Sequence, residues 1–216
     1  MKTALIIGAS GLTGNLLLHE LLQSEEYKTV IAYVRNPLNI QHLKLVQQIV
    51  NFDTLNNGIT AHDVFCCLGT TIKKAGSKHA FEKVDYEYPL KIAELQFKAG
   101  SNSFFLISAM GASLQSSFYY SKVKGKLEKD VLHIGYNSLY IFRPSLIVGN
   151  RTEKRAGEKF AIGLMQFLNP LLFGPFKKFQ SVQAAAIAKC MLHFANNAAK
   201  ENHTILSDEI KTFENF

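Results

Sequence analysis

The sequence predicts an α/β protein with a doubly wound parallel sheet, and three features lead to this prediction. Short apolar runs rich in β-branched and aromatic residues alternate with longer amphipathic segments. The first apolar run leads directly into a glycine-rich loop at 8–14. The chain has 216 residues, of which 47% are apolar and 19% charged, as in a globular domain with a full core. We therefore expect one domain over 1–216, to which 150–216 contributes a small C-terminal lobe.

The glycine-rich loop is predicted to bind a dinucleotide. Its sequence, GASGLTG, lies between the first predicted strand and an amphipathic stretch at 16–22. Gly8 would permit a sharp turn, Gly11 would let the backbone approach a pyrophosphate, and Gly14 would let the helix pack closely on the sheet. The phosphates would meet free amides at the helix start. A plain strand-to-helix turn is the alternative. The other candidate cofactor-binding residues of the loop are Ser10, Leu12 and Thr13.

The second predicted strand, 29–34, ends at Arg35 and indicates the type of cofactor. In dinucleotide-binding folds, an acidic residue about 20 residues beyond the glycine loop holds the ribose of NAD, whereas an Arg accommodates the 2′-phosphate of NADP. We therefore expect NADP(H) to be preferred over NAD(H), although a surface arginine is an alternative reading. A short helix at 43–48 and a third strand at 49–52 should follow. Asp53 would then lie near the adenine, or it could cap the loop.

Three further strands are predicted at 63–68, 103–107 and 138–142, and a long helix at 79–99 should separate the first two of them. Right-handed crossovers between parallel strands give the strand order 3-2-1-4-5-6 most simply. The fourth strand ends at Leu68, Gly69 and Thr70, whose backbone we expect to pass close to the cofactor.

A tyrosine and a lysine four residues apart are the candidate catalytic groups. Of the eight tyrosines, only Tyr120 is followed at this spacing by a lysine, Lys124, and on a helix the two side chains share one face. A nearby ammonium favours the phenolate, so such a tyrosine can protonate a carbonyl oxygen that receives a hydride. Ser108, after the strand 103–107, could donate a second hydrogen bond to that oxygen. A helix that simply displays charge to water is the alternative.

Taken together, these motifs resemble the short-chain dehydrogenase/reductase superfamily, specifically its atypical branch with the glycine pattern GxxGxxG. Five further stretches are similar to the HIV Tat-interacting-protein oxidoreductase subfamily, and with the glycine-rich loop the resemblance extends over most of the chain. These are FCCLGTT at 65–71, KAG at 74–76, YSKVKGKLE at 120–128, FRPS at 142–145 and RAGEKF at 155–160.

The resemblance implies a Rossmann domain that binds NADP(H), with Ser108, Tyr120 and Lys124 as the catalytic triad. It also implies that Arg143 and Pro144 lie near the nicotinamide. Many short-chain dehydrogenases carry an asparagine on the helix after strand four, where this sequence has Asp85, so a proton relay through that helix does not carry over. Members of the subfamily are also linked to regulatory binding.

The most apolar window, 160–176, is too short, and too broken by Pro170, to span a membrane, so we expect no integral membrane association. It would form a core helix and loop, a lid over a hydrophobic substrate, or a surface for a protein partner or homodimer. A helix at 181–194 and a strand at 204–206 should follow. The leading hypothesis is a reductase that moves hydride from NADPH to a small apolar carbonyl compound. The alternative is a redox sensor in which bound NADP(H) sets a partner-binding surface at 160–176.

Charge, cysteines and histidines exclude other classes. The net charge of +7 is spread over scattered lysine pairs without a long basic run, so we expect no nucleic-acid partner. The seven histidines show no i, i+4 spacing, and we expect no metal. Three cysteines, two of them adjacent in an apolar run, should be buried and inert. Because no secretory signal precedes the first strand, a cytosolic location is expected.

Overall fold

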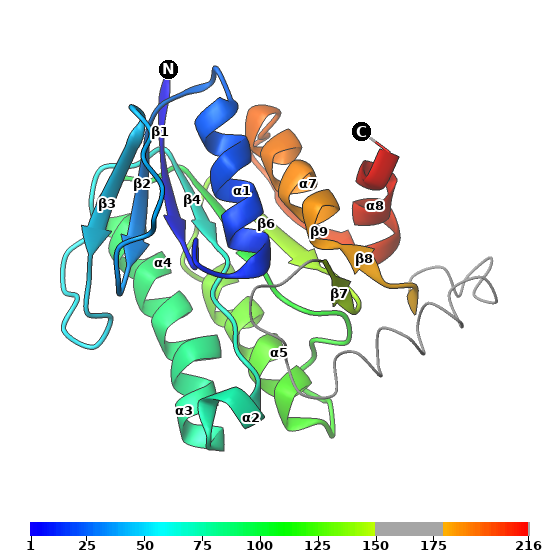
Figure 1. Ribbon diagram of the computed structural model, residues 1–216. Helices are drawn as coiled ribbons and strands as arrows, with labels where there is room; N and C mark the ends of the chain where they lie inside the picture. The colour runs from blue at the N-terminus through cyan, green and yellow to red at the C-terminus, as the bar shows by residue number, and fades with distance from the viewer. Residues whose placement is uncertain (150–178, 216) are drawn as a thin grey trace.

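The computed structural model describes residues 1–149 and 179–215 and confirms the predicted α/β architecture. A sheet of seven parallel strands carries helices on both faces (Figure 1). Its strands are β1 (Lys2–Ile7), β2 (Tyr27–Val34), β3 (Leu45–Ile49), β4 (Asp63–Cys66), β5 (Ser103–Ile107), β6 (Ser138–Arg143) and β9 (Asn202–Leu206). The observed order β3-β2-β1-β4-β5-β6-β9 contains the predicted one, with β9 added beside β6. Two short strands, β7 (Ile147–Val148) and β8 (Val182–Gln183), pair separately.

The helices form a layer on each face of the sheet (Figure 1). One layer contains α1 (Leu12–Gln23) and α7 (Ala184–Asn196), which contact each other along their lengths. The other contains α4 (Tyr88–Lys98) and α5 (Tyr119–Leu132). The shorter helical segments are α2 (Ile72–Ala75), α3 (Lys78–Glu82), a π-helical turn η1 (Lys83–Glu87), α8 (Ser207–Lys211) and a 3-10 turn η4 (Thr212–Asn215).

Strand β5 shows how the two apolar cores arise from the sequence. Every residue from Ser103 to Ile107 is buried, as expected for a central parallel strand covered on both faces. Phe105 and Ile107 pack into the core beneath α1 and α7, whereas Phe104 and Leu106 pack into the core beneath α4 and α5. Successive side chains of the strand thus point to opposite faces of the sheet. The polar groups that follow the strand lie at the carboxyl edge of the sheet, where ligands bind in such folds.

The predicted helix at 43–48 is wrong, because strand β3 occupies this segment and begins four residues before the predicted strand at 49–52. β3 is an edge strand, so its side chains are only half-buried or exposed, and its polar residues hide the strand pattern. Gln47 stabilises this arrangement through its side chain, which accepts a hydrogen bond from the Leu38 amide at 2.6 Å and donates to the Leu38 and Ile40 carbonyls. A side chain that satisfies loop backbone groups gives no periodic signal in the sequence.

The long helix predicted at 79–99 is present as α3, the π turn and α4 in succession. The π turn lies just before Pro89, which lacks the amide that an α-helix would direct to the carbonyl four residues earlier, at Asp85. The Tyr88 amide bonds instead to the Lys83 carbonyl, five residues back. The predicted C-terminal helix and strand correspond to α7 and β9.

The predictions for the segment 160–176 and for the RAGEKF stretch at 155–160 lie outside the described residues. The small C-terminal lobe expected over 150–216 stays a prediction, because 150–178 lie outside the described residues as well. Among the helices of the described ranges, none is long and apolar enough to cross a membrane.

Candidate functional site

The glycine-rich loop between β1 and α1 is packed so tightly that two of its glycines cannot carry a side chain. Gly8 adopts φ +86°, in the left-handed region, and an added Cβ atom would lie 2.6 Å from the Cys67 carbonyl oxygen. An added Cβ at Gly14 would overlap the Gly8 carbonyl oxygen and lie 2.8 Å from its carbon. The Gly11 amide donates to the Gly8 carbonyl at 2.9 Å and closes the turn. The loop therefore brings the start of α1 directly against the end of β1.

The first turn of α1 is available to bind an anion. The helix begins at Leu12 after Gly11, which is extended and provides no side-chain cap. The first amides of a helix lack partners within it, and the positive end of the helix dipole favours a phosphate there. Ser10 is exposed on the loop, whereas Thr13 is buried in the first turn. This cradle fits the pyrophosphate of a dinucleotide.

Arg35 and Asp53, the two cofactor-binding candidates that come after β2 and β3, differ in their surroundings. Arg35 comes directly after β2 and is exposed. Asp53 is engaged by the neighbouring helical segment, because its carboxylate lies 2.6 Å from Lys83 Nζ and accepts a hydrogen bond from the Tyr88 hydroxyl at 2.9 Å. The hydrogen bond with Lys83, followed by that with Tyr88, lowers the pKa of Asp53. These two partners were not foreseen from the sequence.

The segment after β4 is held in place by a buried carboxylate. The Thr70 amide donates to Asp85 Oδ2 at 2.8 Å, so the π turn fixes the backbone directly after Leu68 and Gly69. An added Cβ at Gly69 would meet Asp85 Oδ1 at 3.6 Å, an ordinary contact. The space around Gly69 within the protein would therefore admit a side chain, whereas the space around Gly8 would not.

Lys124 of α5 is buried, with 2% of its surface exposed, and its Nζ lies 2.8 Å from Asp85 Oδ1. Burial lowers the pKa of Lys124, but the carboxylate of Asp85 and the phenol of Tyr120 outweigh burial and raise this pKa overall. Lys124 is therefore held as an ammonium. The sequence singled out Asp85 only as a departure from a family pattern, because the pairing depends on the π turn.

Tyr120 lies in the first turn of α5 and remains 37% exposed. Its ring contacts Phe81 of α3, with 5.6 Å between the ring centroids. The neighbouring Tyr119 is engaged differently, since its hydroxyl donates to Glu82 at 2.9 Å. Of these adjacent tyrosines, Tyr120 is the one placed a single helical turn before the buried ammonium of Lys124, as the spacing predicts.

Ser108 lies directly after β5 and is 4% exposed. Its amide donates to the Phe142 carbonyl at 2.8 Å, which fixes it beside the end of β6. Its hydroxyl has no hydrogen-bond partner within residues 1–149 and 179–215. A buried polar group without a partner costs about 1–3 kcal/mol, so this hydroxyl is suited to a ligand that supplies the partner. The buried hydroxyl and the glycine cradle both fit a bound dinucleotide and its substrate.

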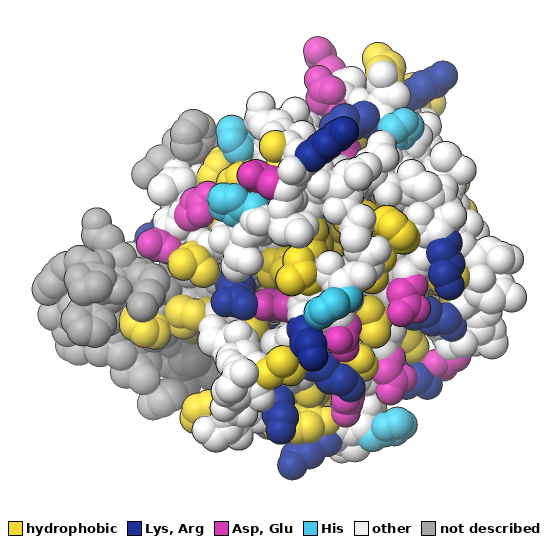
Figure 2. Space-filling view, turned by 180° about the vertical axis from the view of Figure 1, so that it is seen from behind, with side chains coloured by type: hydrophobic (Ala, Val, Ile, Leu, Met, Phe, Trp, Pro, Cys, Tyr) yellow, Lys and Arg dark blue, Asp and Glu magenta, His cyan; other side chains and the backbone are white. Residues whose placement is uncertain are grey.

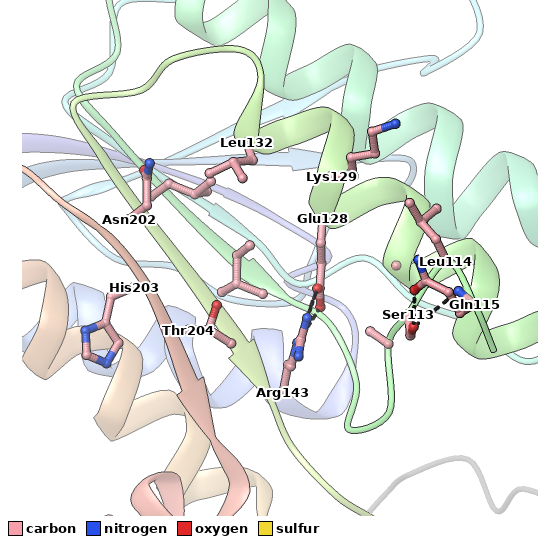
Figure 3. A pocket seen from close by; sticks show the side chains of 14 residues that line it. Ser113, Leu114, Gln115, Glu128, Lys129, Leu132, Arg143, Asn202, His203 and Thr204 are labelled. Atoms are coloured by element: carbon pink, nitrogen blue, oxygen red, sulfur yellow. Dashed lines mark hydrogen bonds and ion pairs between the residues drawn. The ribbon is translucent and has the colours of Figure 1, made fainter.

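Arg143 is the last residue of β6 and Pro144 follows it, and the Arg143 side chain pairs within the protein. Its Nε donates to the two carboxylate oxygens of Glu128 at 3.0 and 3.2 Å, and its Nη2 makes a further contact with the same carboxylate. The Pro144 carbonyl accepts the Met110 amide at 2.9 Å. Arg143 and Glu128 line a groove of about 700 Å³ between α5, β6 and β9. Figure 3 shows their side chains directed toward each other. Ser108, Tyr120 and Lys124 do not line this groove.

The cysteines fit the inert reading. Cys66 and Cys190 are buried and Cys67 is partly buried, all with free thiols. Burial raises the pKa of Cys66 to about 11. In the described part of the chain, no three His, Cys, Asp or Glu side chains are grouped as metal ligands. On the face seen in Figure 2, Lys and Arg are interspersed with Asp and Glu, so this face does not present a basic stripe.

The parallel sheet and the glycine-rich loop packed against its first strand define a Rossmann-type α/β protein. No family model matches the chain. It is 40% identical over 167 residues to Protein HTATIP2 of Rattus norvegicus, a match that covers 74% of this chain and 69% of that protein. It is 30% identical over 203 residues to the mitochondrial Protein FMP52 of Debaryomyces hansenii, with 90% and 88% coverage. The chain belongs to the HTATIP2-like family of atypical short-chain dehydrogenases/reductases.

Solved structures with low sequence identity share the fold. MoeE5 in complex with UDP-glucose and NAD superposes with a TM-score of 0.71 at 16% identity, over 96% of this chain and 79% of that one. The human epimerase family protein SDR39U1 with NADPH gives a TM-score of 0.63 at 15% identity, over 96% and 77%. This likeness confirms the Rossmann-like α/β fold.

The relatives contradict the predicted cytosolic location. FMP52 proteins of Debaryomyces hansenii, Saccharomyces cerevisiae and Candida albicans are named as mitochondrial. The sequence argument addressed only a cleavable secretory signal, and its absence does not distinguish the cytosol from an organelle. The prediction is therefore withdrawn.

Proposed function

We propose that this protein is an NADP(H)-dependent oxidoreductase that acts on a small apolar carbonyl compound or the corresponding alcohol. The observation that carries the proposal is the buried Ser108 hydroxyl, which has no partner in the described structure and follows a central strand at the edge where ligands bind. Tyr120 is exposed enough to reach a substrate, and Lys124 is buried behind it as an ammonium. The resemblance of the sequence motifs to the short-chain dehydrogenase/reductase superfamily implies the same combination of residues.

In the proposed reduction, the bound cofactor supplies the hydride. Tyr120 gives its hydroxyl proton to the carbonyl oxygen, and Lys124 stabilises the phenolate that remains. Ser108 donates a hydrogen bond to the same oxygen, which orients the carbonyl and stabilises the negative charge that develops on it. The glycine-rich loop and the first turn of α1 bind the pyrophosphate. In the direction of alcohol oxidation, Tyr120 takes the proton back.

The preference for NADP(H) rests on Arg35. This exposed cation directly follows β2, and the next residue, Asn36, is uncharged, so the acidic group typical of NAD-selective sites is missing from the strand end. The two structural neighbours divide on this point, since MoeE5 holds NAD and SDR39U1 holds NADPH. We infer that Arg35 contacts the 2′-phosphate.

Thermal unfolding with NADPH and with NADH at equal concentration is expected to show a larger rise in Tm with NADPH. A ligand at about 100 times its Kd adds about 2.7 kcal/mol of stability, so a difference in affinity appears directly as a difference in Tm. Arg35→Gln should remove most of the advantage of NADPH and leave the NADH shift unchanged. The matched control is Lys28→Gln, which removes an exposed cation near the opposite end of β2. An equal or larger shift with NADH for the unmodified protein would contradict the preference.

A further inference from the structure

Asp85 joins three separate segments at the centre of the candidate site. It is fully buried in the π turn, and its two carboxylate oxygens have different partners. Oδ1 lies 2.8 Å from Lys124 Nζ of α5, and Oδ2 accepts the Thr70 amide after β4 at 2.8 Å. One side chain thus fixes both the candidate catalytic lysine and the backbone segment expected to contact the cofactor.

The charge balance around Lys124 depends on this carboxylate. The titratable groups that act on Lys124 are Asp85 from the π turn, Tyr120 from α5 and Cys66 from β4. Burial raises the pKa of Cys66 to about 11, so its thiol is neutral near pH 7. Asp85 is therefore the carboxylate that neutralises the lysine, and its loss would leave a buried ammonium uncompensated.

We propose that Asp85 is a positioning residue, whose carboxylate keeps Lys124 charged beside Tyr120 and at the same time holds the segment after β4 in the cofactor-binding geometry. The catalytic meaning of this inference rests on the proposed function, whereas the electrostatic coupling of Asp85 to Lys124 is a property of the protein without cofactor. The two are therefore testable separately.

Asp85→Asn keeps the size of the side chain and an oxygen acceptor for the Thr70 amide but removes the negative charge. In the unmodified protein the pKa of Lys124 is raised. The charged lysine therefore stabilises the folded state at pH values below the pKa of an unfolded lysine, about 10.4. This contribution is lost as the pH rises through the pKa of Lys124 in the folded protein. In the variant the carboxylate no longer opposes burial, so the pKa of Lys124 falls, and folding is opposed as pH drops through the lowered value. The variant should therefore unfold about 10 °C lower at pH 7.

The decisive measurement is the Tm of the unmodified protein and of Asp85→Asn, both without cofactor, at pH 7 and at about pH 9.5. The higher pH approaches the ordinary pKa of lysine, about 10.4, so a neutral Lys124 costs less there. We expect the deficit of Asp85→Asn to shrink clearly at the higher pH. Adding Lys124→Met to this variant should recover part of the Tm at pH 7, because no buried charge is left uncompensated. A deficit that is equal at both pH values, and that Lys124→Met does not relieve, would overturn the proposal.

Asp63→Asn is the matched control, since Asp63 is a buried carboxylate at the opposite end of the sheet. Its partner Lys2, at 3.2 Å, is partly exposed and can turn to solvent when the carboxylate is lost. Its other partner is the buried Tyr27 hydroxyl, which donates to the carboxylate at 2.8 Å and can donate to the amide oxygen of the variant. This control should lower Tm without the recovery at alkaline pH.

The catalytic reading of the Asp85 inference is checked on the pH profile of kcat/KM. In Asp85→Asn its alkaline limb should move to lower pH, because Lys124 loses its proton more readily, whereas Asp63→Asn should leave the profile unchanged. An unshifted profile would refute the positioning role in turnover. If the unmodified protein shows no turnover, the proposed function fails, and the stability measurements still decide whether Asp85 holds the charge of Lys124.

Discussion

Tyr120→Phe is expected to lower kcat for NADPH-dependent carbonyl reduction by about 10²- to 10⁴-fold, the contribution typical of a positioned general acid. The phenol supplies the proton for the carbonyl oxygen, and phenylalanine keeps the ring against Phe81 while removing that proton. The affinity for NADPH should remain close to that of the unmodified protein, because the glycine-rich loop and Arg35 are untouched. NADPH oxidation over a panel of apolar aldehydes and ketones measures the first quantity, and fluorescence titration of NADPH measures the second.

Tyr119→Phe is the matched control for this prediction. It removes the adjacent phenol of the same helix, which hydrogen-bonds Glu82, so it should cost some stability and little turnover. Activity retained in full by Tyr120→Phe would show that the proton comes from another group. A loss of equal size in both variants would point to distortion of the start of α5.

Much of the candidate site was predictable because its signals are local. The turn at Gly8, the glycine at position 14 in the first turn of α1 and the spacing of Tyr120 and Lys124 each depend on residues within a few positions of one another. Burial on both faces makes central strands such as β5 continuous apolar runs, which a sequence displays clearly. These local features allow the fold and the candidate triad to be predicted from the sequence.

The unforeseen features depend on contacts between distant residues. Asp85 of the π turn pairs with Lys124, 39 positions later on α5, and no periodicity in the sequence reports a contact between such distant residues. Glu128 is the same kind of case, since it lies one turn after Lys124 on α5 and engages Arg143 from β6. The resemblance placed Arg143 beside the nicotinamide, whereas the structure shows its guanidinium bound by this carboxylate. A cofactor contact of Arg143 therefore stays a prediction.

Gly14→Ala is expected to lower both the Tm and the affinity for NADPH, the latter by about 5- to 150-fold for a cost in the usual overpacking range of about 1–3 kcal/mol. In an ordinary helix this change would stabilise the protein by about 1 kcal/mol, because alanine is the better helix former. Here the new methyl group would overlap the Gly8 carbonyl and force α1 away from the end of β1. The displaced helix start then no longer directs its amides to the pyrophosphate.

Asn15→Ala separates this steric effect from a change in helix propensity. It introduces the same residue at the next position of α1 and only shortens a partly buried side chain. This control should therefore keep NADPH affinity and show a Tm equal to or above that of the unmodified protein. Thermal unfolding and NADPH titration of both variants give opposite signs if the Gly8 to Gly14 contact sets the phosphate cradle. A Gly14→Ala protein that is more stable and binds NADPH normally would mean that α1 can shift freely, and the cradle would then lie elsewhere.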